Sequence, residues 1–506
     1  MFVRKKKNKS GVVSIQIIEK RDGKSVLLKT IGSSADPKEI QTLFEQGKAY
    51  VLQFGGQQVF QFEDEQQIVD AHFKALQSFR LVGPELLLGK IFDDIGFHQI
   101  KDELFRHLVI TRLIFPVSKL KTADYLYRFN NEEIDVERIY RYLDKLYTQQ
   151  KQIIEHISYA HTLQILGGKI SIMFYDVTTL YFESEREDAL RKTGFSKEGK
   201  HQNPQIVLGL LVSKGGYPLT YEIFEGKQYE GHTLLPVVEG FKARYKLEEL
   251  VVIADAGLLS NDNIRLLQSK GYQYIIGARI KNETSQIQQK ILANKPGNGQ
   301  NICLHKDEYT RLIVSYSTAR ATKDAANRKR GLEKLEKQIA SGKLTKANIN
   351  NRGYNKYLCL TGDVTITINK QKYEQDAVWD GLKGYITNTT LKTDQIIDNY
   401  RELWQIEKAF RISKTDLQIR PVYHRLQRRI EAHICIAFCA YKVYKELERQ
   451  LKIKKAEWSV EKAIEITKTI YSVTIKTHLS DNLHTRLYIQ KPEQQLLLNL
   501  FNINFG

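Results

Sequence analysis

The segment between residues 171 and 280 constrains the fold more than any other part of the chain. It reads as three apolar strands, then a helix, a strand, a helix and a last strand. Hairpin connections followed by strand–helix–strand crossovers are typical of one mixed sheet with helices packed on it. The strands are expected at 171–182, 205–213, 218–226, 247–257 and 272–280, and the helices at 232–245 and 260–271.

The rest of the 506 residues surrounds this segment. At about 150 residues per domain, a chain of this length suggests roughly three domains. We expect an α/β protein: a mixed-sheet core with a β-rich insertion, preceded by a small β-rich unit and a helical domain. The expected parts are a β-rich unit at 1–65, a helical domain at 66–166, a core at 167–280 and 386–450, an inserted β-rich subdomain at 281–385 and a C-terminal region at 451–506.

Local patterns support this division. In the first part, VVSIQIIEK and SVLLKTIG flank the turn RDGK, and a helix is expected over 36–52 after an Asp-Pro start. The stretch 66–166 carries apolar residues at three-to-four spacing together with many basic residues. A DNA-binding or dimerising helical domain fits this stretch, and so does a plain helical bundle. The C-terminal region is a second candidate for dimerisation.

The insertion combines strands with a basic helix. Strands are expected at 311–317, 356–362 and 364–370, and a helix at 319–339. A charged run on a helix is usually a solvated face, which is the simpler interpretation of this one. A further helical stretch begins at Thr393 and continues to about Leu451.

The charge of the chain indicates a polyanionic partner. Lys plus Arg is 77 and Asp plus Glu is 58, which gives a net charge of +19. DNA, RNA or a membrane surface would suit this excess, and a merely basic soluble protein has it too. The content of 42% hydrophobic and 27% charged residues is that of a globular chain.

Cysteine usage and hydropathy favour a soluble intracellular protein. No two of the four cysteines form a C-x-x-C pair, which argues against a zinc ribbon or a redox motif. Cys435 and Cys439 read as small buried apolar residues. The longest apolar run, 434–441, is far shorter than the ~18 residues that span a bilayer, so we expect no membrane segment and a cytoplasmic protein.

Three carboxylates stand out by position. Asp176 follows the apolar run Ile172 to Tyr175, and Asp255 follows Val251 to Ala254. One Asp at the polar end of a strand is ordinary, because strands often run out into polar turns. Two of them on strands that belong to one sheet are stronger evidence of a site.

The third carboxylate is Glu407, which is expected on the inward stripe of a helix. An inward Glu is costly unless it is paired or bound to a metal, and neither Arg401 nor Arg411 falls on this stripe. The stripe has steps of three and four residues and consists of Ile396, Tyr400, Leu403, Glu407, Phe410 and Lys414.

Two Asp and one Glu form a hard, all-oxygen donor set, which suits Mg²⁺ or Mn²⁺. Without cations, three close carboxylates would repel one another and raise each other's pKa. Paired divalent ions activate a water or a 3′-hydroxyl and stabilise the leaving oxygen of a phosphodiester. This chemistry agrees with the polyanionic partner that the charge indicates.

The residues around these carboxylates resemble a known family. The strand order, with Asp on the first and fourth strands and Glu on a later helix, resembles the RNase H-like fold of DDE transposases and retroviral integrases. FYDVTTL (174–180) and IADAGLLS (253–260) are similar to the first and second Asp motifs of bacterial insertion-sequence transposases. YRELWQIEKAFRISK (400–414) resembles their Y-(2)-R-(3)-E-(6)-K signature.

The resemblance implies roles for individual residues. Asp176, Asp255 and Glu407 would be catalytic and hold the metals. The signature's Arg position is Leu403 here, and Arg401 would take its part by analogy. Contacts with the DNA backbone are implied for basic and aromatic residues on and after this helix: Tyr400, Arg401, Lys414, Arg420, Arg425, Arg428 and Arg429. Trp379 and Trp404 would either stack on a base or pack in the core, and core packing is favoured.

The implied function is DNA transposition: metal-dependent cleavage at the ends of a mobile element and joining of those ends to target DNA. The implied partners are the terminal inverted repeats of the element and the target DNA, with a dimer in the complex. The implied location is the bacterial cytoplasm, at the nucleoid when bound. Two alternatives are an RNase H-like nuclease that does not join ends and a domesticated, non-catalytic DNA-binding protein.

Overall fold

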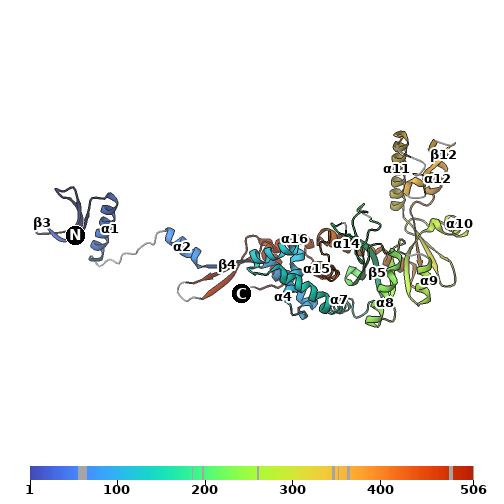
Figure 1. Ribbon diagram of the computed structural model, residues 1–506, viewed down its shortest axis with the longest axis horizontal. Coiled ribbons are helices and arrows are strands. Elements are labelled where there is room, and N and C mark those ends of the chain that lie inside the picture. The colour runs from blue at the N-terminus through green and yellow to red at the C-terminus, as the bar shows by residue number, and fades with distance from the viewer. Residues whose placement is uncertain are drawn as a thin grey trace. The chain divides into compact units, whose positions relative to one another are not determined.

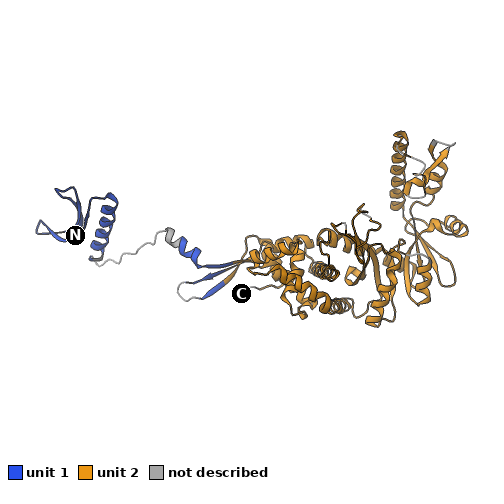
Figure 2. Ribbon diagram, viewed as in Figure 1, with its two compact units in different colours: residues 1–78, 474–484 blue, residues 79–473, 485–506 orange. Residues whose placement is uncertain are grey.

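The computed structural model describes most of the chain and divides it into two compact units (Figure 2). One unit contains residues 1–78 and 474–484, and the other contains residues 79–473 and 485–506. The described residues are 1–54, 65–184, 186–196, 199–258, 261–342, 344, 348–350, 353–361, 365–477 and 482–504.

The N-terminal sheet has one strand more than the sequence predicts. β2 (Val13–Arg21) and β3 (Lys24–Ser34) form the expected hairpin, and the expected helix is α1 (Pro37–Phe54). The turn residues Asp22 and Gly23 both have positive φ, as a two-residue hairpin turn requires. The added strand, β1 (Phe2–Lys7), pairs antiparallel with β2. Its lysines lie on an exposed edge, where such residues discourage pairing with another chain.

The stretch 66–166 is mainly helical, as predicted, apart from β4 (Leu76–Leu81). β4 belongs to a three-stranded sheet with β15 (Tyr471–Lys476) and β16 (Leu483–Tyr488). Because these partner strands are some 400 residues away along the chain, no local sequence pattern predicts β4. The helices are α2 (Glu65–Ala75), α3 (Lys90–Ile95), α4 (Glu103–Ile114), α5 (Lys119–Tyr125), α6 (Val136–Lys145) and α7 (Lys151–Ile165).

The central sheet has eight strands in the order β10-β11-β14-β9-β8-β5-β6-β7. β5 pairs antiparallel with β6 and parallel with β8, β6 pairs antiparallel with β7, and β8 pairs parallel with β9. The predicted RNase H-like mixed-sheet fold is therefore confirmed. The strands are β5 (Ile172–Tyr181), β6 (Gln205–Ser213), β7 (Pro218–Glu225), β8 (Val251–Ala254) and β9 (Gln273–Ala278), with helices α8 (Leu234–Tyr245) and α9 (Asn261–Ser269).

Part of the expected insertion extends this sheet. β10 (Asn301–His305), β11 (Arg311–Tyr316) and β14 (Leu382–Thr387) continue it antiparallel beyond β9, which covers an edge that would otherwise be open. The strand expected at 311–317 is thus β11 of the central sheet. Four further elements of the insertion lie together (Figure 1): α11 (Thr318–Ala340), β12 (Leu358–Thr361), β13 (Thr365–Ile368) and α12 (Lys370–Ala377). The helix α10 (Ser285–Ala293) lies between β9 and β10 in the chain.

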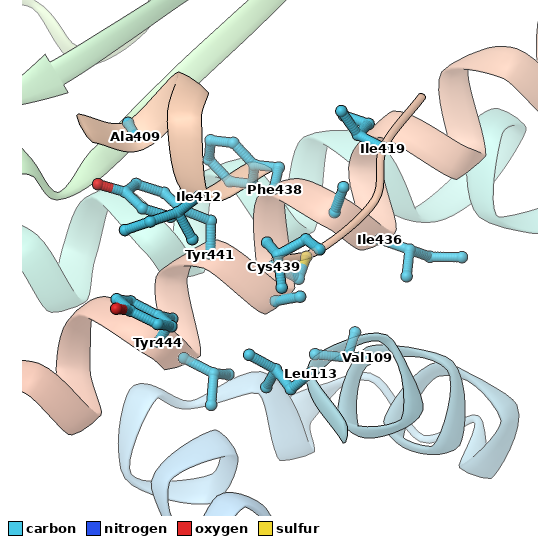
Figure 3. Packing of buried hydrophobic residues seen from close by; sticks show 14 of the residues in the cluster. Val109, Leu113, Ala409, Ile412, Ile419, Ile436, Phe438, Cys439, Tyr441 and Tyr444 are labelled. Atoms are coloured by element: carbon cyan, nitrogen blue, oxygen red, sulfur yellow. The ribbon is translucent and has the colours of Figure 1, made fainter. Parts of the chain in front are cut away.

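The helices after β14 complete the core. The stretch expected as one helix from Thr393 is broken at Glu402 and Leu403, which gives α13 (Thr393–Arg401) and α14 (Trp404–Thr415). α15 (Gln427–Ile453) is buried over most of its length and packs against α4 and α14, where Cys439 lies near Val109 and Leu113 (Figure 3). α16 (Val460–Thr467) and α17 (Pro492–Leu500) follow. No helix in the described ranges has both the length and the apolar content needed to cross a membrane.

Candidate active site

Asp176 and Asp255 lie on neighbouring parallel strands at matching positions. Tyr175 of β5 is in register with Ala254 of β8, and each Asp is one residue further along. Neighbouring strands lie about 4.8 Å apart. Side chains alternate across a strand, so both carboxylates share the sheet face of Phe174 and Ile253, against which α13 and α14 pack.

The two carboxylates differ in their surroundings. Asp176 is half-buried, and its carboxylate accepts a hydrogen bond of 2.8 Å from the backbone N–H of Val177. Asp255 is exposed, because β8 ends at Ala254 and the chain turns away. Leu259 and Ser260, the end of the second Asp motif and the expected cap of the next helix, lie outside the described residues.

Tyr400 connects α13 to Asp255. Its side chain is only 4% exposed, and its hydroxyl donates a hydrogen bond of 3.0 Å to Asp255 Oδ1. Burial, together with the negative charge of Asp255, raises the pKa of Tyr400, which keeps the hydroxyl protonated as a donor. Gly277 of β9 makes the approach possible, because a Cβ atom at this position would overlap the Tyr400 hydroxyl.

Glu407 is exposed, so its predicted inward orientation is wrong. Leu403 and Phe410, its neighbours on the predicted stripe, are buried, so the stripe continues past the short break between α13 and α14. α14 turns Ile406 and Ala409 toward the core, and Glu407 falls on the flank of that buried face. The buried-stripe argument for this residue therefore fails, whereas its location next to the sheet face of the two Asp residues stands.

A lysine that the sequence analysis missed lies beside these groups. The Lys383 ammonium on β14 stands 4.5 Å from the centre of the Tyr400 ring. It interacts electrostatically with the carboxylates of both Asp255 and Glu407. The sequence signal that could have identified this lysine is a single charged residue within the strand LKGYIT. Lys383 lies on the same face of this strand as Tyr385.

Burial, above all, lowers the pKa of Lys383 from its ordinary value. The positive charges of Arg320 and Arg401 lower this pKa further, whereas Asp255 and Glu407 oppose the shift. Arg320, in the first turn of the basic helix α11, therefore acts electrostatically on this site. The interpretation of α11 as a solvated charged face did not include this effect.

The carboxylates do not form a finished ligand cluster. Within the described part of the chain, no group of three or more His, Cys, Asp or Glu side chains is close enough together to hold a metal ion. The donor types do fit Mg²⁺ or Mn²⁺, since carboxylate oxygens are the hard ligands that these ions prefer. The matched positions of Asp176 and Asp255 supply two such donors, with Glu407 on an adjacent helix.

The residues expected to contact DNA occupy different environments. Arg401 is exposed and forms an ion pair of 3.0 Å with Asp398. Lys414 and Arg420 are half-buried, and Arg425 is exposed. These four side chains lie along α13, α14 and the segment after α14.

Arg428 and Arg429 have a partner within the protein. They pair with Asp144 at 2.9 and 3.0 Å, which ties α15 to α6. Trp379 is half-buried and packs against the core, as favoured from the sequence. Trp404 is 49% exposed, so core packing was the wrong expectation for it. It begins α14 directly after the break, on the solvent side.

Comparison with known proteins places this site in context. Two solved structures are similar to parts of this chain. The piggyBac transposase synaptic complex with hairpin DNA has 9% sequence identity and a TM-score of 0.37, and the match covers 77% of this chain and 79% of that chain. The Mos1 mariner paired end complex with Mn has 10% identity and a TM-score of 0.14, and the match covers 31% of this chain and 54% of that chain. No curated protein matches the chain. Residues 167–442, more than half of the sequence, match the family described as Transposase DDE domain, and the chain therefore belongs to this family.

Proposed function

We propose that the protein is an active DNA transposase that cleaves DNA at the ends of its own element and joins those ends to target DNA. The observation that carries the proposal is the placement of Asp176 and Asp255 at matching positions on one face of adjacent parallel strands, next to the helix of Glu407. All three lie within the matched transposase domain.

In this proposal Asp176, Asp255 and Glu407 hold Mg²⁺ or Mn²⁺. When bound, the metal supplies activation of the attacking oxygen and stabilisation of the leaving oxygen at the phosphodiester. Tyr400 holds the Asp255 carboxylate in place through its hydroxyl. Lys383 supplies positive charge near Asp255 and Glu407. This charge reduces the electrostatic repulsion between the two carboxylates.

The finer assignments also belong to the proposal. The chain would be a member of the bacterial insertion-sequence group with the Y-(2)-R-(3)-E-(6)-K signature, acting in the cytoplasm on terminal inverted repeats as a dimer. The burial of Tyr400 favours a role in positioning Asp255 over a DNA contact. Arg401, Lys414, Arg420, Arg425 and Arg428 remain the proposed DNA contacts. The five-part domain division, with the C-terminal region in dimerisation, is proposed with them.

A cleavage and joining assay tests this function. The substrate is the DNA that flanks the gene, with Mg²⁺ or Mn²⁺ present, and the wild type is compared with Asp255→Asn. Asp262→Asn is the matched control, because Asp262 is an exposed residue of α9 whose carboxylate lies 3.9 Å from Arg265. We expect metal-dependent nicks at a fixed end and joined products from the wild type and the control, and neither from Asp255→Asn.

The other results decide between the alternatives. Nicks without joined products would indicate that the protein is a nuclease that does not join DNA ends. Tight binding of the flanking DNA by all three proteins, with no cutting by any of them, would replace it by a non-catalytic DNA-binding role.

A further inference from the structure

A second cationic site lies among α4, α5, α15 and the segment that follows α14. It is a pocket of about 370 Å³. We call it the cationic pocket and define it by five of its lining residues: Arg112, Lys119, Arg420, His424 and His433. None of the three carboxylates discussed above lines it.

Two of these cations are deeply buried. Arg112, on α4, is 5% exposed, and Lys119, the first residue of α5, is 4% exposed. The Arg112 guanidinium contacts His433 Nδ1 at 3.5 Å. In the described ranges, no carboxylate pairs with Arg112 or with Lys119.

Several basic side chains line the pocket and affect one another's pKa. Burial lowers the pKa of Arg112 to about 10. Burial, and then the charge of Arg112, lowers the pKa of Lys119 well below its ordinary value. Burial also lowers the pKa of His424 to about 3, with Lys119 and Arg112 adding to the shift. Both His424 and His433 are therefore neutral at pH 7, and the buried positive charge comes from Arg112, beside which a bound anion would favour the charged form of Lys119.

Nearby carboxylates are engaged with other cations. Asp144 pairs with Arg428 and Arg429, and Glu431 pairs with Lys151 at 2.9 Å. A buried charge that lacks a counter-charge destabilises the folded state. A pocket built in this way is stabilised when an anion enters it.

The pocket lies next to the central sheet. The segment after α14 lies along the end of β5, where the Val422 backbone N–H donates to the Tyr181 carbonyl at 3.1 Å. β5 is the strand that carries Asp176. At the pocket, Tyr423 presents a ring that is 72% exposed, and Lys121 is exposed as well. An aromatic ring beside buried cations suits a nucleotide, whose base stacks while its phosphate is neutralised.

We propose that the cationic pocket binds a phosphate group of the DNA backbone, held by Arg112 and Lys119. The arginine fork offers paired donors to phosphate oxygens, and the lysine adds a compact charge. Free inorganic phosphate has the same chemistry and is the second source that the experiment separates. The assignment to DNA rests on the proposed function, whereas the phosphate site itself does not.

The first experiment measures thermal unfolding of the full chain with and without inorganic phosphate at constant ionic strength. Bound phosphate should raise the wild-type midpoint by about 2 °C or more at saturating concentration. Lys119→Met and Arg112→Met should abolish this rise. The control is Lys101→Met, which removes one charge from an exposed residue just before α4 and should keep the rise.

The same melts separate a ligand site from a structural role. Without phosphate, Lys119→Met should unfold at the same temperature as the wild type or higher, because it removes a buried charge without a counter-charge. If phosphate raises the midpoint of Lys119→Met as much as that of the wild type, the pocket is not the phosphate site. If Lys119→Met instead lowers the phosphate-free midpoint and keeps the phosphate-dependent rise, Lys119 is structural and the proposal is wrong.

The second experiment measures duplex DNA affinity by fluorescence anisotropy, in the Asp255→Asn background so that no cleavage is needed. Lys119→Met should weaken binding at least fivefold and reduce the salt slope of log K by about 1, whereas Lys101→Met should change affinity by less than twofold. Loss of the phosphate-dependent rise with unchanged DNA affinity would overturn the assignment to DNA in favour of free phosphate. Because neither readout uses cleavage, failure of the transposition assay leaves both results interpretable.

Discussion

The geometry of Asp255 depends on contacts with residues distant in the sequence. Tyr400 reaches its carboxylate from α13, and Gly277 leaves the room for the ring on β9. The Lys383 ammonium, on β14, lies over the same ring. At the residue scale, the site is therefore an acid held by a tyrosine whose own place depends on a glycine.

Replacing Tyr400 with Phe tests this support. The change removes one charge-assisted hydrogen bond, worth about 1.5–3 kcal/mol, and keeps the ring. We expect the cleavage rate to fall by roughly 10- to 100-fold, and more Mg²⁺ to be needed for half-maximal rate. Cleavage kinetics over a range of Mg²⁺ concentrations give both values. An unchanged rate and metal requirement would show that the hydroxyl has no part in holding Asp255.

Gly277→Ala serves as the partner in a double-mutant cycle. The added methyl would displace the Tyr400 hydroxyl, so we expect a loss similar to that of Tyr400→Phe. In the Tyr400→Phe background the same change should cost much less, because the displaced group is already absent. Additive losses would mean that Gly277 acts through another contact, such as the backbone N–H of Ala256, which also lies near its position.

At the scale of elements, the buried face of α14 decides how Glu407 is presented. Ile406, Ala409 and Phe410 form this face, and Glu407 lies on its flank, where it is exposed. An exposed carboxylate is available to a ligand and costs little in folding.

Glu407→Gln should therefore separate activity from stability. We expect the midpoint of thermal unfolding to move by about 1 °C at most, since the side chain is exposed, and cleavage to fall by more than about 100-fold, as for loss of a metal ligand. The control is Glu333→Gln on α11, also exposed. Normal cutting by Glu407→Gln would remove this residue from the proposed site.

Asp376 of α12 illustrates the stability of the inserted elements. Burial alone would raise the pKa of Asp376, but hydrogen bonds from Lys356, Tyr357 and Lys281 lower it to about 2. Because the folded pKa is depressed, this stabilisation is complete above the unfolded value of about 3.8 and is lost as pH falls toward 2. It is worth about 1 kcal/mol after allowance for solvent screening.

Asp376→Asn should accordingly destabilise the protein at pH 7, and its difference from the wild type should shrink between pH 4 and pH 2. Thermal melts at several pH values measure the difference. Glu374→Gln, an exposed residue on the same helix, is the control. A difference that stays constant across this range would contradict the depressed pKa.

For the whole molecule, the net charge of +19 should govern the proposed association with DNA. Each phosphate neutralised by a basic side chain releases condensed counterions, which makes affinity fall steeply with salt. With about six to ten such contacts, the affinity of Asp255→Asn for duplex DNA should fall by roughly 10³- to 10⁵-fold between 50 and 200 mM salt. Anisotropy titrations measure the slope, and a change of less than tenfold would contradict a DNA-binding surface of this size.

The strand order of the core, Asp255 after the end of its strand and the basic character of the chain could be predicted from the sequence, whereas Asp176 lies within β5 and not at its end. The predicted features follow from local signals, namely apolar runs, turn residues and charge counts, which need no knowledge of distant partners. The break at Leu403, the role of β11 in the central sheet and the place of Lys383 were decided by tertiary structure. Each depends on which segments pack together: helical periodicity assumes an unbroken helix, and a single lysine in a strand acquires meaning only from the carboxylates that the fold brings to it.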